Sequence, residues 1–320
     1  MKERLVLEGL GLTVLTVVFY QFQTTLLIFL IPLVILYKRQ GYRKGTYGAL
    51  LALVSLAIIK VLKEPALLEK GLELLALDLT YPFTFLVGLM LMENPKVSLL
   101  PATQRLGIVT LLAAGMGIPL IQYVLKDPHF DSFLRLQVEG IIQRVVEGKS
   151  TIDIGNLGSI SVKEIVQSSK IVFANTYALA YMLTFLINWV VGYRVGLRSM
   201  GIYAADLILG KVKLPEKIVW AFLLGWTGVL TGLIQPLGWV SIVFWNIALL
   251  TSALYGIQGV DILRFFLNKM GRFRALALFG IIFSLFIPGL NIIVLVGIPL
   301  LGVSELWIQY RRIEEERSAK

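Results

Sequence analysis

The sequence predicts an all-α protein, a polytopic transmembrane helical bundle, on three observations. Of its 320 residues, 57% are hydrophobic and only 16% are charged, and the mean hydropathy is +0.80. The apolar residues gather in long runs, many of them near the length of roughly 17–25 residues that suits a spanning helix. The Lys and Arg residues are distributed unevenly between these runs. A bilayer accepts apolar side chains as outward-facing surface, whereas a water-soluble protein of this length would expose them to water.

We expect about ten spans along the chain. Only four residues, Gln21 to Thr24, separate the first two, so residues 5–37 form either one broken helix or a re-entrant pair. The expected spans are 5–20, 25–37, 46–62, 79–92, 106–125, 171–193, 218–234, 239–262, 275–287 and 290–308.

The charge bias predicts the orientation of these spans. Short cytoplasmic loops of membrane proteins are enriched in Lys and Arg. If both termini are cytoplasmic, more than two thirds of the 30 basic residues fall on the inner side, and the net charge of +10 is a topology signal rather than a sign of nucleic-acid binding. No cleavable signal peptide is expected, because bulky residues follow the first apolar run. The protein is therefore predicted to be a multi-pass protein of a cell inner (cytoplasmic) membrane, with the lipid bilayer as its surroundings.

One long outer loop divides the chain into parts. Residues 126–170 are expected to form an amphipathic outer-surface loop with two helices, at about 129–147 and 161–169, because apolar residues such as Leu134, Val138 and Ile141 recur at helical spacing. The loop serves either as a plain connector or as a lid over an outward-facing cavity. The predicted domains are the N-terminal membrane bundle 1–125, the loop 126–170, the C-terminal membrane bundle 171–310 and the charged cytoplasmic tail 311–320.

The composition excludes several chemistries. The chain has no Cys and a single His, His129, so a disulfide, an iron–sulfur cluster, a thiolate nucleophile and a His-based metal site within one chain are excluded. No complete phosphate-binding loop, dinucleotide fingerprint or zinc-protease motif occurs. We therefore expect neither a cofactor nor a metal, no ATPase within the chain and no catalytic residues.

Polar residues inside the expected spans are the best candidates for a binding site, because polar groups are costly in hydrocarbon and turn inward. One set lies at helical spacing on the sixth span and a second set on the eighth, so that two polar faces would line a shared cavity. The alternative is that these residues only hydrogen-bond neighbouring helices. The candidate ligand-binding residues are Tyr177, Tyr181, Thr184 and Asn188 on the sixth span, and Thr251, Tyr255, Gln258 and Asp261 on the eighth.

Asp261 is the most notable ionisable residue near a span. Arg264 follows it at i+3, a spacing that permits a local ion pair near the cytoplasmic end of the eighth span. A structural ion pair is favoured over a role in ligand binding or proton relay.

Short motifs from the sixth span to the ninth carry a family resemblance. They are Leu214-Pro215 with Trp220, Asn246, Ile257-Gln258-Gly259-Val260, Phe265 or Phe266, and the basic Arg272 and Arg274; in the first half Pro32, Tyr37 and the Arg43 to Gly45 turn also match. On these residues the chain resembles the YybS-like family of multi-span bacterial membrane proteins, a domain family of unknown function. That family is distantly similar to the substrate-capture subunits of energy-coupling-factor importers, and a related fold occurs in the cell-shape protein of the MreD type.

The resemblance and the polar faces together favour a small-solute binding or transport component without its own ATPase. Its partners would be a small-molecule solute and separate energising or envelope proteins. The alternative is a scaffold in a cell-envelope assembly, MreD-like, in which the helices pack without a solute site. A membrane-embedded enzyme is the third hypothesis and the least favoured.

Overall fold

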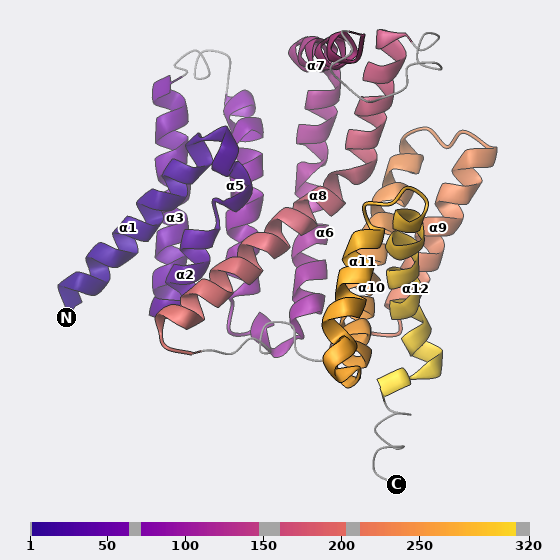
Figure 1. The fold of residues 1–320 in the computed structure, drawn as a ribbon. Coiled ribbons are helices and arrows are strands. Elements are labelled where there is room, and N and C mark those ends of the chain that lie inside the picture. The colour runs from indigo at the N-terminus through magenta and orange to yellow at the C-terminus, as the bar shows by residue number, and fades with distance from the viewer. Residues whose placement is uncertain (1, 64–71, 147–160, 203–211, 312–320) are drawn as a thin grey trace.

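The computed structural model describes residues 2–63, 72–146, 161–202 and 212–311, and this part of the chain is all-helical, with eleven α-helices and no strand. Figure 1 shows three groups of helices. The first holds α1, α2, α3 and α5, the central group holds α6 and the long α8, and the last holds α9 to α12. Helix α7 lies across one end of the central group.

The first group opens with a helical hairpin. Helix α1 (Lys2–Gln21) leads through the short 3-10 helix η1 (Gln23–Ile28) into α2 (Ile31–Gln40). Glu8 of α1 forms an ion pair with Arg39 of α2, and the Gln40 side-chain amide donates to the Leu5 carbonyl at 2.8 Å. The end of α2 thus lies beside the start of α1, so residues 5–37 form a returning pair and not one broken helix.

Helix α2 is short for a spanning helix. Its ten residues extend about 15 Å, roughly half the hydrocarbon thickness of a bilayer. Two longer helices complete the group, α3 (Tyr42–Lys63) and α5 (Leu72–Met92). The 3-10 helix η2 (Val97–Leu99) then leads to α6 (Ala102–Lys126) of the central group.

Helix α7 (Pro128–Val146) confirms the amphipathic helix predicted at residues 129–147. It appears nearly end-on in Figure 1, whereas α6 and α8 run along the page. Val138 is buried and Leu134 half-buried, while Arg135 and Glu139 are exposed. Ile141, expected on the apolar stripe, is 57% exposed. The side chain of Val145 and the predicted flexible segment 155–158 lie outside the described residues.

The prediction of a second, separate surface helix at residues 161–169 is wrong. Residues 162–169 are the first turns of α8, which runs without interruption over 38 residues from Val162 to Ser199. Ser161 caps this helix, accepting a hydrogen bond from the Glu164 backbone while the Glu164 carboxylate accepts from Ser161 N–H. Lys170, the last residue of the predicted loop, lies within this helix, and its amino group contacts the carboxylate of Asp131 on α7 at 2.5 Å.

A side chain from α10 interrupts the backbone hydrogen bonds of α8. The Asn246 amide oxygen accepts from Ala178 N at 3.0 Å, and its nitrogen donates to the Ala174 carbonyl at 2.8 Å. In a regular α-helix these two backbone groups bond to each other. An inserted side chain is a recognised cause of bending, and Figure 1 shows α8 changing direction on its way from α7 toward α2.

The last group is built on α10 (Trp239–Lys269), against which α9 (Ile218–Ile234) and α12 (Leu290–Ile308) pack. Glycines allow α10 and α12 to approach closely. A Cβ at Gly259 would overlap the Ile298 carbonyl, and a Cβ at Gly302 would overlap the Tyr255 carbonyl. The 3-10 helix η4 (Gly271–Phe273) and α11 (Arg274–Ser284), with eleven residues, connect the two.

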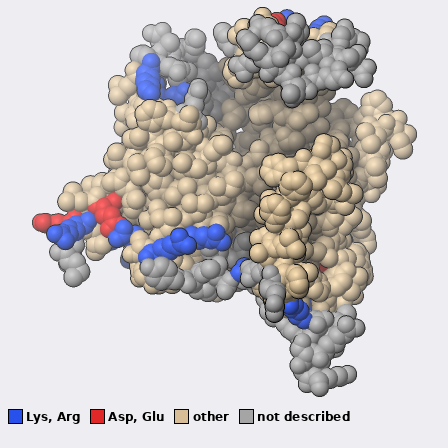
Figure 2. All heavy atoms as spheres, in the orientation of Figure 1, with Lys and Arg blue, Asp and Glu red and all other residues tan. Residues whose placement is uncertain are grey.

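The surface agrees with a membrane protein. Five described helices are long and apolar enough to cross a membrane, and shorter apolar helices occupy 79–92, 218–234 and 275–284. Many large apolar side chains of these helices are exposed, such as Leu111, Leu233 and Phe279. Figure 2 shows a broad band of uncharged atoms, with the visible Lys, Arg, Asp and Glu gathered toward its two ends.

Candidate functional site

Three of the four candidates on the sixth span line one cavity. Tyr177, Tyr181 and Thr184 lie on one face of α8 and border a cavity of about 280 Å³, which we call the tyrosine cavity. Its other walls come from α5 and α6, with Leu27 of η1 at one edge. The remaining lining residues are Thr80, Tyr81, Thr84, Phe85, Ala113, Ala114, Gly117, Leu120, Ile121, Val124, Phe173, Thr176 and Ala180.

Hydrogen bonds to neighbouring helices fix the side chains of the two α8 tyrosines that line this cavity. The Tyr177 hydroxyl donates to the Ala114 carbonyl of α6 at 3.0 Å, and the Tyr181 hydroxyl donates to the Thr84 carbonyl of α5 at 2.9 Å. The Tyr181 ring centroid lies 4.2 Å from that of Phe85. Since each hydroxyl donates its proton to a carbonyl, its oxygen keeps only acceptor capacity.

Asn188, the fourth candidate, is used for structure. It is fully buried, and its amide oxygen accepts from Leu30 N at 3.0 Å while its nitrogen donates to the Leu27 carbonyl at 2.6 Å. These groups belong to the connection between η1 and α2, where the helical hydrogen bonds are interrupted. Asn188 therefore satisfies the backbone of the N-terminal hairpin and does not line the tyrosine cavity.

The candidates on α10 do not join this cavity, so the expected shared cavity is wrong. Thr251 donates to the Ile247 carbonyl of its own helix at 2.7 Å. Tyr255 is fully buried and packs edge-on against Phe222 of α9, with ring centroids 5.6 Å apart. The physical reason is that α10 contacts α8 through Asn246, which is not on the predicted polar face of α10. The candidate residues of α10 therefore do not line the tyrosine cavity.

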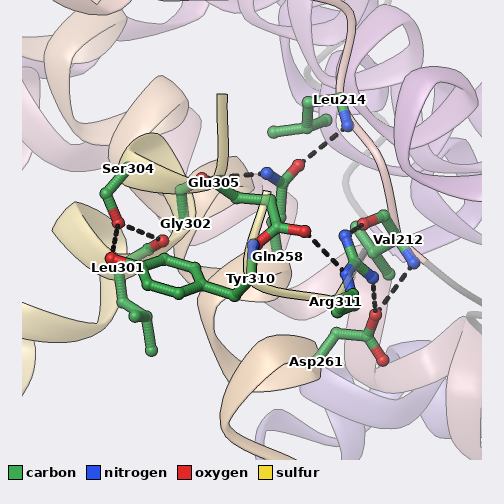
Figure 3. A network of polar contacts seen from close by, with 10 residues as sticks. All are labelled: Val212, Leu214, Gln258, Asp261, Leu301, Gly302, Ser304, Glu305, Tyr310 and Arg311. Atoms are coloured by element: carbon green, nitrogen blue, oxygen red, sulfur yellow. Dashed lines mark hydrogen bonds and ion pairs between the residues drawn. The ribbon is translucent and has the colours of Figure 1, made fainter. Parts of the chain in front are cut away.

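Gln258 and Asp261 instead hold the last group together near the C-terminal end of α10 (Figure 3). The Gln258 side chain accepts from Leu214 N and donates to the Gly302 carbonyl, both at 2.8 Å. It thereby connects the segment before α9 to α12. Like Asn188 and Asn246, it is a buried amide that serves the backbone of other elements.

Asp261 forms an ion pair that the sequence did not predict. Its partner is Arg311, at 2.8 Å, whereas the sequence offered Arg264. Arg311 also contacts Glu305 at 2.9 Å and donates to the Val212 carbonyl at 3.0 Å, and Asp261 accepts from Val212 N at 3.0 Å. Figure 3 shows the guanidinium enclosed by these three residues.

A second cavity, of about 610 Å³, lies on the opposite face of α8. We call it the long cavity. Of the sequence candidates it contains only Asp261. Helix α8 contributes Leu179, Met182, Leu183 and Leu186, the segment before α9 contributes Val212, and α12 contributes Val294, Leu295, Ile298 and Pro299. The lining residues on α10 are Leu249, Ser252, Ala253, Gly256, Ile257, Val260, Asp261 and Arg264.

Sequence reasoning missed Asn246 and Arg311 as organising residues, and also Glu93. Glu93 pairs with Lys38 at 2.6 Å and accepts from the Trp189 indole N–H at 2.9 Å, which joins α2 to α8 at their ends. One signal was available for Asn246, a lone amide in a long apolar run. The described residues hold no group of three or more His, Cys, Asp or Glu that could hold a metal.

The fold defines the class of the protein as an all-helical bundle with several helices able to cross a membrane. No protein-family model, curated protein or solved structure matches the chain.

Proposed function

We propose that the protein is a multi-pass inner-membrane protein that binds a small solute in the tyrosine cavity, as a binding or transport component without its own ATPase. One observation carries the proposal: Tyr177, Tyr181 and Thr184, picked out by their spacing alone, border one cavity between three helices. Packing residues would fill such a space with side chains. A separate energising or envelope protein would be its partner.

The proposed orientation has both termini in the cytoplasm. Figure 1 has the start of α1 and the end of α12 away from α7. The positive-inside rule assigns the basic segments near Arg39 and Arg264 to the cytoplasm. In this orientation α7 lies on the outer surface, and the tyrosine cavity lies in the outer half of the bundle, since it is lined by the α7-proximal parts of α6 and α8.

The walls suggest the chemistry of the solute. They are mostly apolar, and a volume of about 280 Å³ lies just below the roughly 300–1,000 Å³ of ligand pockets. The phenolic oxygens of Tyr177 and Tyr181, two of the lining residues, are the proposed acceptors. A small, largely apolar molecule with one hydrogen-bond donor fits these features.

Helix α7 is the proposed lid of this site. Phe130 of α7 packs on Phe173, a lining residue, with ring centroids 5.7 Å apart. The Asp131–Lys170 ion pair fastens the same end of α7 to α8, and Lys170 also donates to the Leu125 carbonyl at 2.7 Å. A movement of α7 would therefore uncover more of Phe173, which is 38% exposed, and open the outer end of the cavity.

A pair of glycine substitutions on α6 tests the proposal. A Cβ at Gly117 would point toward the Tyr177 ring, 3.8 Å away, so Gly117→Leu fills the cavity without meeting backbone. A Cβ at Gly115 meets nothing within 4 Å, so Gly115→Leu is the matched control. Small molecules released from the purified wild type and both variants are compared by mass spectrometry. We expect a compound retained by the wild type and by Gly115→Leu and lost from Gly117→Leu; identical profiles from all three would refute solute binding at this cavity.

The second candidate function is the envelope scaffold. The observation that favours it is that the side-chain amides of Asn188 and Gln258 both hydrogen-bond to backbone groups of the protein, as expected of packing residues. A scaffold predicts that Gly117→Leu leaves the function of the protein in cells unchanged, because no solute needs the cavity.

A further inference from the structure

We propose that the long cavity is a second binding site, for a single-chain amphiphile with an anionic head, and that this amphiphile enters from the bilayer. The site is separate from the one in the proposed function, because the two cavities share no lining residue and lie on opposite faces of α8. The inference therefore stands whether or not the tyrosine cavity binds a solute.

The shape of the cavity fits an extended chain. Helix α10 forms its floor, and α8 and α12 form its two walls. Its lining residues on α10 run from Leu249 to Arg264, a distance of about 22 Å at the helical rise of about 1.5 Å per residue. The walls contribute only apolar side chains, such as Met182 and Ile298.

Polar groups are confined to one end of this length. Ser252, in the apolar part, is already engaged, because its hydroxyl accepts from Trp226 at 3.0 Å and donates to the Ala248 carbonyl at 2.6 Å. Asp261 and Arg264 are the charged residues among the described lining residues, and they lie one helical turn apart at the same end. A ligand that matches this distribution has one charged head and a long apolar tail.

The charges at that end favour an anionic head. Asp261 and Glu305 are both bonded to Arg311, whose side chain is 11% exposed. Arg264 lines the cavity and is exposed, and the exposed Lys213 follows the lining residue Val212. Among the described residues, this end thus has Arg264, Arg311 and the neighbouring Lys213 beside the two carboxylates. A guanidinium binds carboxylate and phosphate groups in a planar, bidentate manner.

The cavity opens sideways onto apolar surface. Three of its lining residues are strongly exposed, Leu183 at 45%, Val260 at 52% and Leu295 at 64%. In a bundle surrounded by hydrocarbon, this side faces lipid tails and not water. A membrane amphiphile can therefore slide into the cavity without leaving the bilayer.

Three single-chain probes with the same oleoyl tail test the proposal: oleate, lysophosphatidylglycerol and lysophosphatidylcholine. Their binding to the full-length protein in nanodiscs is measured by equilibrium dialysis of the radiolabelled compounds. We expect both anionic probes to bind at least about tenfold more tightly than lysophosphatidylcholine. The better of the two anionic probes identifies the head as a carboxylate or a phosphate. Equal affinity for all three would overturn the proposal.

Substitutions in the floor of the cavity provide the second arm. A Cβ at Gly256 comes no closer than 3.7 Å to Pro299, so Gly256→Leu extends into the cavity without a backbone clash, whereas a Cβ at Gly297 of α12 meets nothing within 4 Å. We expect Gly256→Leu to weaken anionic binding at least about tenfold, and Gly297→Leu and Gly117→Leu to leave it within about twofold. Should Gly256→Leu fail to fold, Leu183→Trp narrows the opening instead. Unchanged binding in the folded variant would overturn the assignment.

Arg264→Gln tests the head group. We expect it to bring the affinity for the anionic probes down to that for lysophosphatidylcholine, with thermal unfolding followed in parallel. If a folded Arg264→Gln protein keeps the full preference for the anionic probes, the charged end does not bind the head and the proposal fails.

Discussion

The two cavities share α8 as a wall but differ in where their polar groups lie. In the tyrosine cavity the α8 face contributes Tyr177 and Tyr181, whose hydroxyls reach the carbonyls of Ala114 on α6 and Thr84 on α5. In the long cavity the α8 face is entirely apolar, and the charges of Asp261 and Arg264 lie at one end of α10. The first arrangement suits a small molecule with a local hydrogen bond, and the second suits a molecule with separate polar and apolar ends.

The comparison also shows that a polar face on a spanning helix has two uses. Toward α5 and α6, the polar face of α8 borders a space. One turn further along, Asn188 continues the same face but satisfies the interrupted backbone between Leu27 and Leu30. Spacing on a helix therefore indicates which residues turn inward, while the neighbouring backbone decides what they do there.

The largest effect that separates the two cavities is expected from Gly259→Val. The new side chain would overlap the Ile298 carbonyl and force α12 away from α10. Overpacking of this kind destabilises by about 1–3 kcal/mol or more, and we expect about 3 kcal/mol here because backbone must move. The measurement is unfolding in detergent, with Gly297→Val as the control, which adds the same side chain to an open position. Retention of the tyrosine-cavity ligand by a folded Gly259→Val protein would show that the two cavities are independent of each other. Equal stability of both variants would contradict the close approach of α10 and α12 at Gly259.

A smaller effect is expected from Arg311→Gln. This change removes the ion pairs to Asp261 and Glu305 and loosens the Val212 segment that borders the long cavity. Because Asp261 is 20% exposed and Arg311 11%, water screens part of the pairing, and we expect a loss of about 2 kcal/mol, below the roughly 3–5 kcal/mol for breaking a fully buried pair. Unfolding and amphiphile binding are both measured, and Arg198→Gln, at an exposed position of α8, is the control. A loss of stability without weaker amphiphile binding would separate the network from the long cavity.

The smallest effect on stability is expected from Asn246→Leu, although it acts on both cavities. The freed Ala178 N–H and Ala174 carbonyl can bond to each other once α8 straightens, which recovers part of the roughly 1–3 kcal/mol of an unsatisfied buried group. We expect a loss of about 1 kcal/mol. Spin labels at Ser168→Cys and Val191→Cys in this Cys-free chain report the end-to-end distance of α8, which should increase. Asn268→Leu, at an exposed position of α10, should change neither quantity; an unaltered distance in Asn246→Leu would show that the amide does not cause the bend.

The sequence predicted the features that depend on local periodicity. The all-helical class, helix α7 and the common face of Tyr177, Tyr181 and Thr184 follow from hydrophobic and polar spacing, and the structure agrees with each. The start of α8 was misplaced, because residues 161–169 were interpreted as a separate surface helix and the span was started at residue 171, after the charged Lys170. Its charge is compensated by Asp131 of another helix, and spacing along one helix carries no information about that partner.

The rest of the site depends on contacts between distant parts of the chain. Asn246 bonds to groups about 70 positions earlier, and Arg311 bonds to Asp261 and to Val212, which lie 50 and 99 positions away. A local pattern offers Arg264 for Asp261 because it considers only the next turn. The long cavity is likewise invisible in the sequence, since its walls are apolar residues that resemble any lipid-facing helix.

The buried amides impose an order on assembly during synthesis. The chain is made from its N-terminus, so the hairpin of α1 and α2 is complete long before Asn188, 158 positions after Leu30, can bond to its turn. Helix α8 in turn precedes Asn246, and until α10 arrives it can keep the straight, fully bonded form of an ordinary helix. Until α8 is made, Leu30 N–H and the Leu27 carbonyl therefore lack the partner that Asn188 provides, and we expect α8 to acquire its bend when α10 docks. A nascent chain halted before residue 246 would hold every helix of the tyrosine cavity but not yet its final shape.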